Sequence, residues 1–223
     1  MASIAQNAED LRLRLEAACP NGGSPVSIIA VTKYATLDQM RAVIACGFTC
    51  LGESRIQDLE EKKRIFPDPN LEWHFIGRLQ SNKVKKAVML CDVIQSVDRL
   101  SLLDEINQAA EKLNKKIKIF LQVRFHHSET QGGFEPENLN HHLDKVVSFQ
   151  FVEVVGIMTI GPHTSSADSI RNCFQQANQL FNDLRDDNRS IRYLCMGMSG
   201  DFEIAVAEGA NMIRIGSLLL QEE

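Results

Sequence analysis

Short apolar runs alternate with longer amphipathic stretches along almost the whole chain. The first run, Ile28–Val31, is continuous and contains β-branched residues, which is typical of a strand buried on both faces of a parallel sheet. The predicted strands are Val26–Thr32, Thr49–Gly52, Leu71–Ile76, Val93–Gln95, Lys118–Val123, Val152–Met158, Tyr193–Met196 and Met212–Ile215. The predicted helices are Ile4–Ala18, Leu37–Cys46, Arg55–Ile65, Ser81–Leu90, Arg99–Leu113, Glu137–Val147, Ser169–Leu184 and Asp201–Glu208.

This alternation predicts βαβ units and therefore a parallel sheet. Eight units fit a closed (β/α)₈ TIM barrel, although the chain is at the short end of the usual size. The alternative is a doubly wound open sheet, which usually carries a glycine-rich phosphate turn after its first strand. Here the segment KYATLDQ (Lys33–Gln39) follows and contains no glycine, so we favour the barrel. We expect one α/β domain over residues 1–223, with the extra helix in residues 1–22 and the barrel in residues 26–217.

Composition and charge narrow the function classes. The 223 residues are 44% hydrophobic and 24% charged, with a net charge of −5, which disfavours a broad nucleic-acid or anionic-membrane surface. The mixed-sign run EEKKR (Glu60–Arg64) predicts a solvated helix face. The six cysteines form no C-x-x-C pair, and we see no hydrophobic signal core and no apolar run long enough to cross a bilayer. We therefore expect a reducing, cytoplasmic location.

Lys33 stands where the first apolar run ends. A lysine at a strand end usually covers apolar surface with its stem while its ammonium reaches water. In a barrel, however, an inward Lys33 would share its face with Val31 and Ile29 and lie at the C-terminal mouth, where barrels place their chemistry. Partial desolvation there would favour the neutral amine, the nucleophile that forms a Schiff base with an aldehyde such as pyridoxal phosphate or with a carbonyl substrate.

A candidate phosphate site lies in the last two strand–loop units. The segment CMGMSGDFEIAVAEGA (Cys195–Ala210) predicts a strand end, a glycine-rich turn and a helix start, with Ser199 and Asp201 at N-cap positions. Gly216 and Ser217 follow the last strand, and phosphate sites of barrels commonly use the loops after the seventh and eighth strands. The alternative is that these residues serve only the turns.

Arg214 lies within the last strand, two residues before Gly216. On closure this strand adjoins the first, so Arg214 can face the lumen beside Lys33. A buried arginine needs an acceptor, and a pyridine nitrogen could supply it. Because arginine keeps its proton, that nitrogen would stay unprotonated and the cofactor would be a weaker electron sink. A structural ion pair with a neighbouring carboxylate is the alternative.

Several motifs extend this picture over nearly the whole chain. They are AVTK (Ala30–Lys33), GES (Gly52–Ser54), WHFIGRLQSNK (Trp73–Lys83), the strand FLQV, GMS (Gly197–Ser199) and AVAEGANMIRIGS (Ala205–Ser217). The combination of HFIG-x-LQSNK, MGMS and RIG is highly specific. With these motifs the chain resembles the pyridoxal phosphate homeostasis proteins of the YggS/PROSC type.

The resemblance implies a barrel like the N-terminal domain of alanine racemase, with pyridoxal 5′-phosphate on Lys33. It implies that Ser199 and Ser217, with the Gly216 backbone, hold the phosphate and that Arg214 approaches the ring nitrogen. Met198 and Ser54 complete the cofactor-binding residues that we expect.

Some positions depart from the family pattern. Ser54 replaces a usual asparagine near the ring, and Ser217 replaces a usual threonine but keeps the hydroxyl. Gln131 stands near a position where the family tends to carry lysine, and the C-terminal LLLQEE replaces a usual aromatic-glycine ending. None of these changes removes the Schiff-base lysine.

Two functions compete at such a site. A racemase-like enzyme needs an acid/base on each face of its substrate, and in alanine racemase a tyrosine from a second domain supplies one of them. Here we expect Tyr34 to point away from Lys33 and Tyr193 to lie at the wrong end of the barrel. We therefore favour a carrier without strong catalytic activity, which takes up pyridoxal phosphate and releases it to apo-enzymes or to hydrolysis. The expected lack of the racemase's second domain favours a monomer.

Histidines give weaker signals. We expect no metal at His126–His127 or His141–His142, because adjacent side chains diverge and no cysteine or carboxylate completes a tetrahedral set. His74 can line the pocket or simply pack, and Asn82 and Lys83 can contact a ligand, a partner or only solvent. Trp73 is expected in the core.

Overall fold

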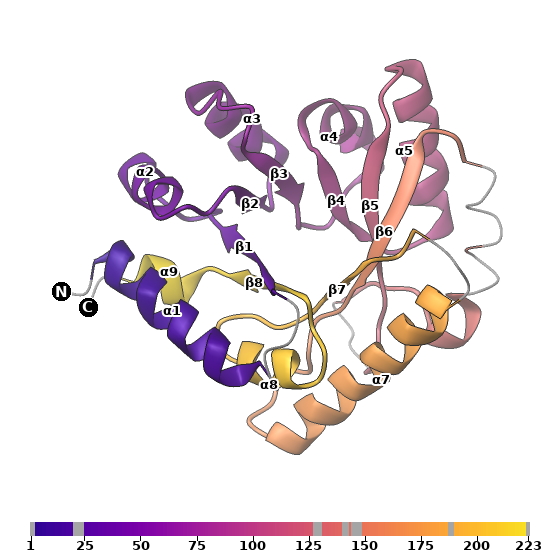
Figure 1. Cartoon of the computed structure of the whole chain (residues 1–223). Coiled ribbons are helices and arrows are strands. Elements are labelled where there is room, and N and C mark those ends of the chain that lie inside the picture. Colours follow the sequence, from indigo (N-terminus) through magenta and orange to yellow (C-terminus); the bar gives the residue numbers. More distant parts are fainter. Residues whose placement is uncertain are drawn as a thin grey trace.

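Eight parallel strands close into a barrel in the computed structural model, which describes residues 3–19, 25–126, 131–139, 143, 149–186 and 190–221. Each described strand pairs with its neighbour in the sequence, and the last pairs with the first (Figure 1). The strands are β1 (Ser27–Val31), β2 (Cys50–Glu53), β3 (Glu72–Phe75), β4 (Val93–Val97), β5 (Ile117–Gln122), β6 (Val152–Met158), β7 (Tyr193–Cys195) and β8 (Met212–Ile215). The predicted (β/α)₈ barrel is confirmed.

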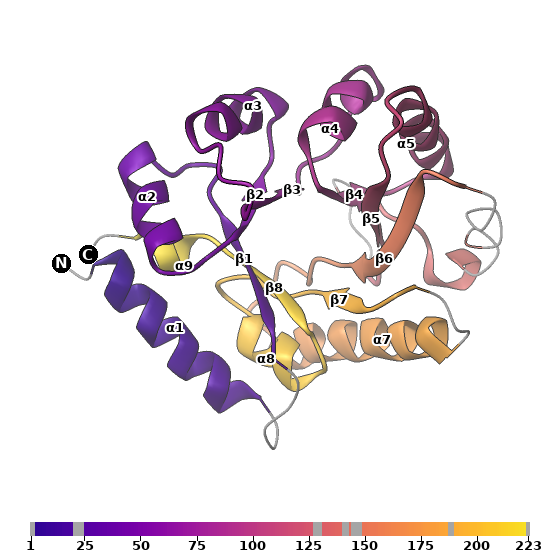
Figure 2. The same ribbon diagram turned by 45° about the horizontal axis from the view of Figure 1, so that its top comes forward.

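Helices surround this barrel on its outside (Figures 1 and 2). The described ones are α1 (Ile4–Ala18), α2 (Leu37–Ala45), α3 (Ile56–Ile65), α4 (Val84–Leu90), α5 (Leu100–Lys112), α7 (Ala167–Asp186), α8 (Phe202–Ala207) and α9 (Ser217–Leu220), with 3₁₀ turns η2 (Ser81–Lys83) and η3 (Pro136–Asn138). The four-residue α9 was not predicted. Most of the predicted helix Glu137–Val147 lies outside the described residues.

The lumen and the outer layer divide the apolar side chains by strand alternation. The lumen cluster contains Ile29, Val93, Phe120, Val155, Met158, Cys195 and Met212. Side chains of the intervening strand positions, such as Trp73 and Ile213, pack outward against the helices in a larger cluster. A period of two along each strand therefore sends one set of side chains into the barrel and the other toward the helices.

α1 joins the beginning of the chain to its end. Ser3 caps this helix by accepting a 3.2 Å hydrogen bond from the Gln6 backbone N–H. The Asn7 side-chain amide donates to the carbonyls of Leu219 and Gln221, which belong to the last turn. α1 lies beside α8 and α9 in both ribbon views, so it covers the outside of the units that the sequence predicts to hold phosphate (Figure 2).

Candidate functional site

A cavity of about 560 Å³ opens at the C-terminal mouth of the barrel. Parallel strands end on the same side, so segments far apart in the sequence meet there. The lining residues are Val31, Lys33, Tyr34, Gln39, Ile76, Met198, Ser199, Gly200, Arg214, Gly216, Ser217, Leu220 and Gln221. Six of the seven cofactor-binding residues expected from the sequence are therefore together, and Ser54 is the exception.

Lys33 lies on the turn that follows β1. Ile29 faces the lumen and Val31 lines the cavity, so the alternation that placed Lys33 inward holds to the end of the strand. The expectation of a desolvated lysine is wrong, since the Lys33 side chain is exposed. The reason is that the strand ends two residues earlier, at Val31, and the turn carries the amine to the rim of the cavity.

Tyr34 corrects a second expectation. It lines the same cavity as Lys33, and the Lys33 Nζ atom lies 5.1 Å from the centroid of its ring. The pleat of a strand would have separated the two side chains, but strand alternation no longer applies on the turn. Tyr34 is 82% exposed, so its ring stands at the rim of the cavity.

A buried polar network holds the turn that carries Lys33. Lys62, from α3, donates to the Thr32 carbonyl at 2.6 Å and to Glu53 Oε1 at 2.8 Å. Thr32 Oγ1 donates to the same carboxylate oxygen at 2.6 Å. The Thr32 carbonyl belongs to the peptide bond that leads into Lys33, so this network fixes the start of the turn.

The run EEKKR predicts side chains exposed to solvent, and this prediction is wrong for Lys62. Lys62 is only 8% exposed, and Glu53 and Thr32 are fully buried. The mixed charges along the helix gave no sign of this, because the partner carboxylate comes from the neighbouring β2. The acidic residue of the GES motif, next to Ser54, was the signal that could have found it.

Arg214 is buried in β8 with its guanidinium at the floor of the cavity. Nη2 donates to the Thr159 carbonyl at 2.9 Å, and Nη1 lies 3.3 Å from the Cys195 carbonyl and 3.1 Å from Cys195 Sγ. Its hydrogen-bond partners among the described residues are the Thr159 and Cys195 carbonyls and Cys195 Sγ rather than a carboxylate. Backbone carbonyls therefore orient the cation while its charge stays available to the cavity.

Ser199 and Asp201, in the turn after β7, were both expected at N-cap positions of the helix that follows. Asp201 stands at the N-cap of α8, but its Oδ1 accepts from the Met198 backbone N–H at 2.6 Å. Burial raises the pKa of the Asp201 carboxyl, against the opposing effects of this hydrogen bond and of the Arg214 charge. Ser199 instead accepts a 3.4 Å hydrogen bond from the Leu218 N–H of α9, which ties the two last loops together.

Glycine is required at Gly197, and the space beside Gly216 is tight. Gly197 has a φ of +93°, and a Cβ there would lie 2.6 Å from the Ala205 side chain. A Cβ on Gly216 would lie 3.3 Å from the Val31 Cβ and would narrow the cavity between β1 and β8. Ser217 follows at the start of α9 and is exposed.

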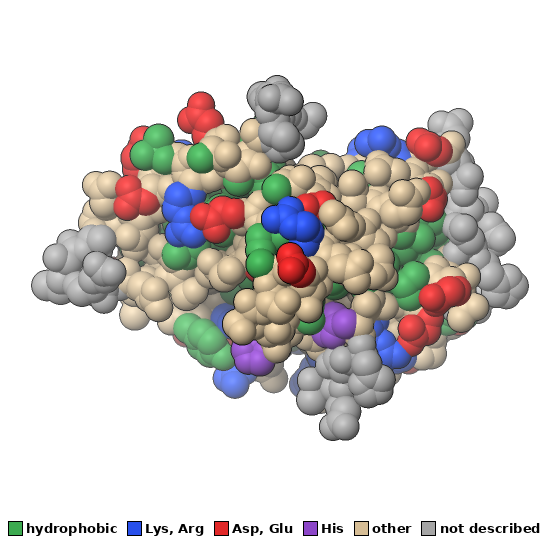
Figure 3. All heavy atoms as spheres, turned by 90° about the horizontal axis from the view of Figure 1, so that it is seen from below, with side chains coloured by type: hydrophobic (Ala, Val, Ile, Leu, Met, Phe, Trp, Pro, Cys, Tyr) green, Lys and Arg blue, Asp and Glu red, His purple; other side chains and the backbone are tan. Residues whose placement is uncertain are grey.

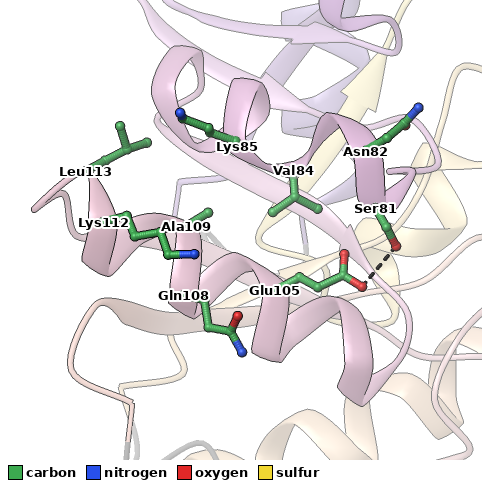
Figure 4. Close-up of a pocket in the computed structure, with 9 residues that line it drawn as sticks. All are labelled: Ser81, Asn82, Val84, Lys85, Glu105, Gln108, Ala109, Lys112 and Leu113. Carbon is green, nitrogen blue, oxygen red and sulfur yellow. Dashed lines mark hydrogen bonds between the residues drawn. The ribbon is translucent and has the colours of Figure 1, made fainter.

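Other candidates lie elsewhere. Ser54 is half-buried and does not line the cavity. Asn82 lines a separate 490 Å³ hollow between α4 and α5, where Ser81 donates to Glu105 (Figure 4). Trp73 is in the core, as expected. His127 and the pair His141–His142 lie outside the described residues.

His74 packs inside the lumen, with its Nε2 atom 3.2 Å from Glu72 Oε2 and its Nδ1 atom 3.2 Å from the Gln95 amide nitrogen. The Glu72 carboxylate has a pKa lowered to about 2, mainly because of the His74 hydrogen bond. Desolvation, together with Glu72, raises the pKa of the neighbouring Cys50 thiol to about 11. This polar cluster lies at the opposite end of the strands from Lys33.

Comparison with known proteins agrees with this geometry. The family model of the alanine racemase N-terminal domain matches residues 2–222. The pyridoxal phosphate homeostasis protein of Aquifex aeolicus is 38% identical over 94% of this chain and 93% of its own length, and that of Helicobacter pylori is 35% identical over 88% of each.

Solved structures give the same result. PipY of Synechococcus elongatus with PLP bound is 33% identical and has a TM-score of 0.87 over 98% of this chain and all of its own. Alanine racemase of Clostridium difficile shares only the fold, with 14% identity and a TM-score of 0.77, and 56% of its chain is covered. The chain belongs to the alanine racemase N-terminal domain family, among the pyridoxal phosphate homeostasis proteins.

Proposed function

We propose that this protein binds pyridoxal 5′-phosphate as a Schiff base on Lys33 and buffers or delivers it, without strong catalytic activity. The observation that carries the proposal is the mouth cavity, where an accessible lysine amine, two serine hydroxyls and a buried arginine line one space. Its volume of about 560 Å³ falls within the usual range of small-molecule sites. When bound, the cofactor supplies an aldehyde and an electron-withdrawing ring.

The phosphate end fits the loops after β7 and β8. The Ser199 and Ser217 hydroxyls can donate to phosphate oxygens, and the missing Cβ of Gly216 lets a ligand approach the backbone. The Ser199–Leu218 hydrogen bond keeps the two loops together before any ligand arrives. Barrels often hold phosphate at this position, which supports the assignment.

Arg214 determines what the ring can do. Three contacts to Thr159 and Cys195 fix its guanidinium, which has five N–H donors and therefore has some left for a ligand. Arg214 would donate to the ring nitrogen of the cofactor and could not give up a proton to it. The ring would then stay a weak electron sink, which favours storage of the cofactor over chemistry at the substrate Cα.

The racemase-like alternative rests on Tyr34, since this tyrosine lines the cavity next to Lys33. Two-base racemisation requires the bases on opposite faces of the substrate. Tyr34 and Lys33 are consecutive on one turn, and the Lys33 ammonium is close to the tyrosine ring. The two groups therefore stand on the same side, and Tyr193 packs against Phe120 at the start of β7, away from the mouth.

The distribution of charge on the surface bears on which partners the protein can bind. Basic and acidic side chains are interspersed on the face in Figure 3, where the described residues gather into no single-sign patch. With a net charge of −5, this supports neither nucleic acid nor an anionic membrane as partner.

None of the helices in the described part of the chain is long and apolar enough to span a membrane. Apo-enzymes that use pyridoxal phosphate are the proposed recipients, and a cytoplasmic monomer is the proposed form.

Borohydride reduction with mass spectrometry tests the Schiff base. The purified chain mixed with pyridoxal phosphate should show an imine absorbance band, and reduction should fix one adduct that peptide mapping assigns to Lys33. Lys33→Ala should lose both, whereas Lys116→Ala, which removes an exposed lysine away from the mouth, should keep both. An adduct spread over several lysines would overturn the proposal, and interconversion of D- and L-alanine at ordinary enzymatic rates would favour the racemase.

A further inference from the structure

The base of the barrel contains a second set of side chains with a different chemistry. Cys50 and Glu72 are the first residues of the adjacent strands β2 and β3, and they are direct register partners. His74 lies two residues further along β3, on the same lumen-facing side as Glu72. We propose that Cys50, Glu72 and His74 form a site for a divalent transition metal, with zinc as the best fit.

The distances between the ligand atoms support this assignment. Cys50 Sγ lies 3.7 Å from Glu72 Oε2, which lies 3.2 Å from His74 Nε2, and the three atoms are all within 4.8 Å of one another. Zinc bond lengths of about 2.0–2.3 Å give tetrahedral edges of roughly 3.3–3.7 Å. The two edges to Glu72 Oε2 are therefore close to the length of a zinc coordination shell, and the third edge, from Cys50 Sγ to His74 Nε2, is at most 4.8 Å.

The donor types select the metal. A thiolate, an imidazole and a carboxylate together suit Zn²⁺, whereas Mg²⁺ and Ca²⁺ prefer oxygen alone. Three protein ligands leave a fourth position open for water or a small anionic ligand. Binding replaces the Cys50 thiol proton, which is released to solvent, and uses the Nε2 lone pair of the neutral His74 imidazole.

The surrounding groups can support these ligands. Lys118 donates at 3.0 Å to Glu72 Oε1, the carboxylate oxygen that does not face Cys50 and His74. The Gln95 amide contacts His74 Nδ1, and with the amide turned over its oxygen accepts the Nδ1 proton that a metal-bound imidazole carries. Lys118 also adds a positive charge that opposes a cation, so it should limit the affinity.

An ion can reach this cluster from the base of the barrel. Cys50 and Glu72 are half-buried, and only His74 is fully buried. Lys33 stands at the other end of the strands, so the metal site does not depend on the cofactor site. Loss of one should leave the other intact, which makes the two proposals separable.

Cobalt titration of the full chain tests the site, after chelator treatment and without pyridoxal phosphate, which binds metals itself. We expect one equivalent of Co²⁺ to give a thiolate-to-cobalt charge-transfer band and the intense d–d bands of four-coordinate cobalt, with Zn²⁺ abolishing both. Cys50→Ser should remove the charge-transfer band and weaken binding by about tenfold or more. Cys46→Ser, which changes another half-buried free cysteine, should bind as the wild type does. Lys118→Met should bind several-fold more tightly, and Lys33→Ala should bind unchanged.

Thermal melting gives a second measurement that does not depend on spectroscopy. Zinc should raise the melting temperature of the wild type and of Cys46→Ser but not that of Cys50→Ser. Circular dichroism would show that each variant is folded before the titration. The absence of a charge-transfer band in the folded wild type, or an equal band in Cys50→Ser, would overturn the metal site.

Discussion

Substitution of Lys62 by methionine should destabilise the protein far more than loss of a surface lysine. The side chain is 8% exposed, and its ammonium makes the 2.8 Å contact with Glu53 and the 2.6 Å contact with the Thr32 carbonyl. Methionine fills a similar volume but leaves the Glu53 carboxylate, which is fully buried, without its cation. Removing one partner of a buried pair costs about 3–5 kcal/mol of unfolding free energy.

A loss of about 4 kcal/mol corresponds to a fall in melting temperature of roughly 8–16 °C for a chain of this length. The assay is denaturant and thermal unfolding followed by circular dichroism and by the fluorescence of Trp73, the only tryptophan. Lys86→Met is the matched control, because Lys86 pairs with Glu60 at the surface, where an ion pair contributes roughly 0–1 kcal/mol. The double variant Glu53→Leu/Lys62→Met should regain part of the loss, because both buried charges are then gone.

Two results would refute this reasoning. A loss below about 1 kcal/mol for Lys62→Met would mean that the buried pair carries no more than a surface pair does. A double variant less stable than Lys62→Met would mean that the Thr32 hydrogen bond to Glu53, rather than the charge pair, holds this region. In the proposed carrier, Lys62→Met should also slow imine formation at Lys33 in the folded state, since the turn loses its anchor.

The remaining predictions concern the mouth and the base of the barrel. Gly197→Ala should lower the unfolding free energy by at least about 1–3 kcal/mol, because φ is +93° and the added Cβ would clash with Ala205; urea unfolding measures it, and unchanged stability would contradict it. Arg214→Gln should shift the imine absorbance band and weaken pyridoxal phosphate binding, measured by equilibrium dialysis; an identical spectrum and affinity would remove Arg214 from the ring. The pKa of Glu72 falls from 4.5 to about 2 on folding, so its contribution to stability is present above the unfolded pKa and is lost as pH falls through the folded one. Melting temperatures between about pH 5 and pH 2 should therefore fall less in Glu72→Gln than in the wild type, and equal slopes would assign the acid loss to other groups.

The alternation of apolar runs was sufficient to predict the barrel. Buried strands appear as short continuous apolar runs, whereas the helices between them are longer and repeat their apolar positions every three to four residues. It also placed Arg214 and Ile29 in the lumen, since their outward neighbours are apolar and a strand has only two faces. The prediction failed where the chain leaves a strand. Tyr34 was assigned to the wrong side because a turn has no fixed period, and α9 was missed because four residues show no periodicity.

Contacts between elements could not be derived from the sequence. The pairing of Lys62 with Glu53 depends on how α3 lies against β2, and the local run of mixed charges is equally typical of a solvated helix. The approach of Cys50 to Glu72 depends on the register between β2 and β3, which no local pattern specifies. The same limit applies to Ser199, whose partner is an amide of α9 rather than of its own helix.

Barrel closure explains why the mouth suits a carrier. β1 and β8 lie side by side only because the sheet closes, and Ile29 is the register partner of Arg214. Six of the cofactor-binding residues that the sequence predicts line the cavity. They come from the first and the last two strand–loop units, which therefore meet along one side of the mouth. Tyr34 and Met198 leave apolar surface exposed at the rim of this cavity. In the proposed carrier, a ligand bound there would contact this side of the mouth, and the described lining residues place Tyr34 beside Lys33 rather than across the substrate from it.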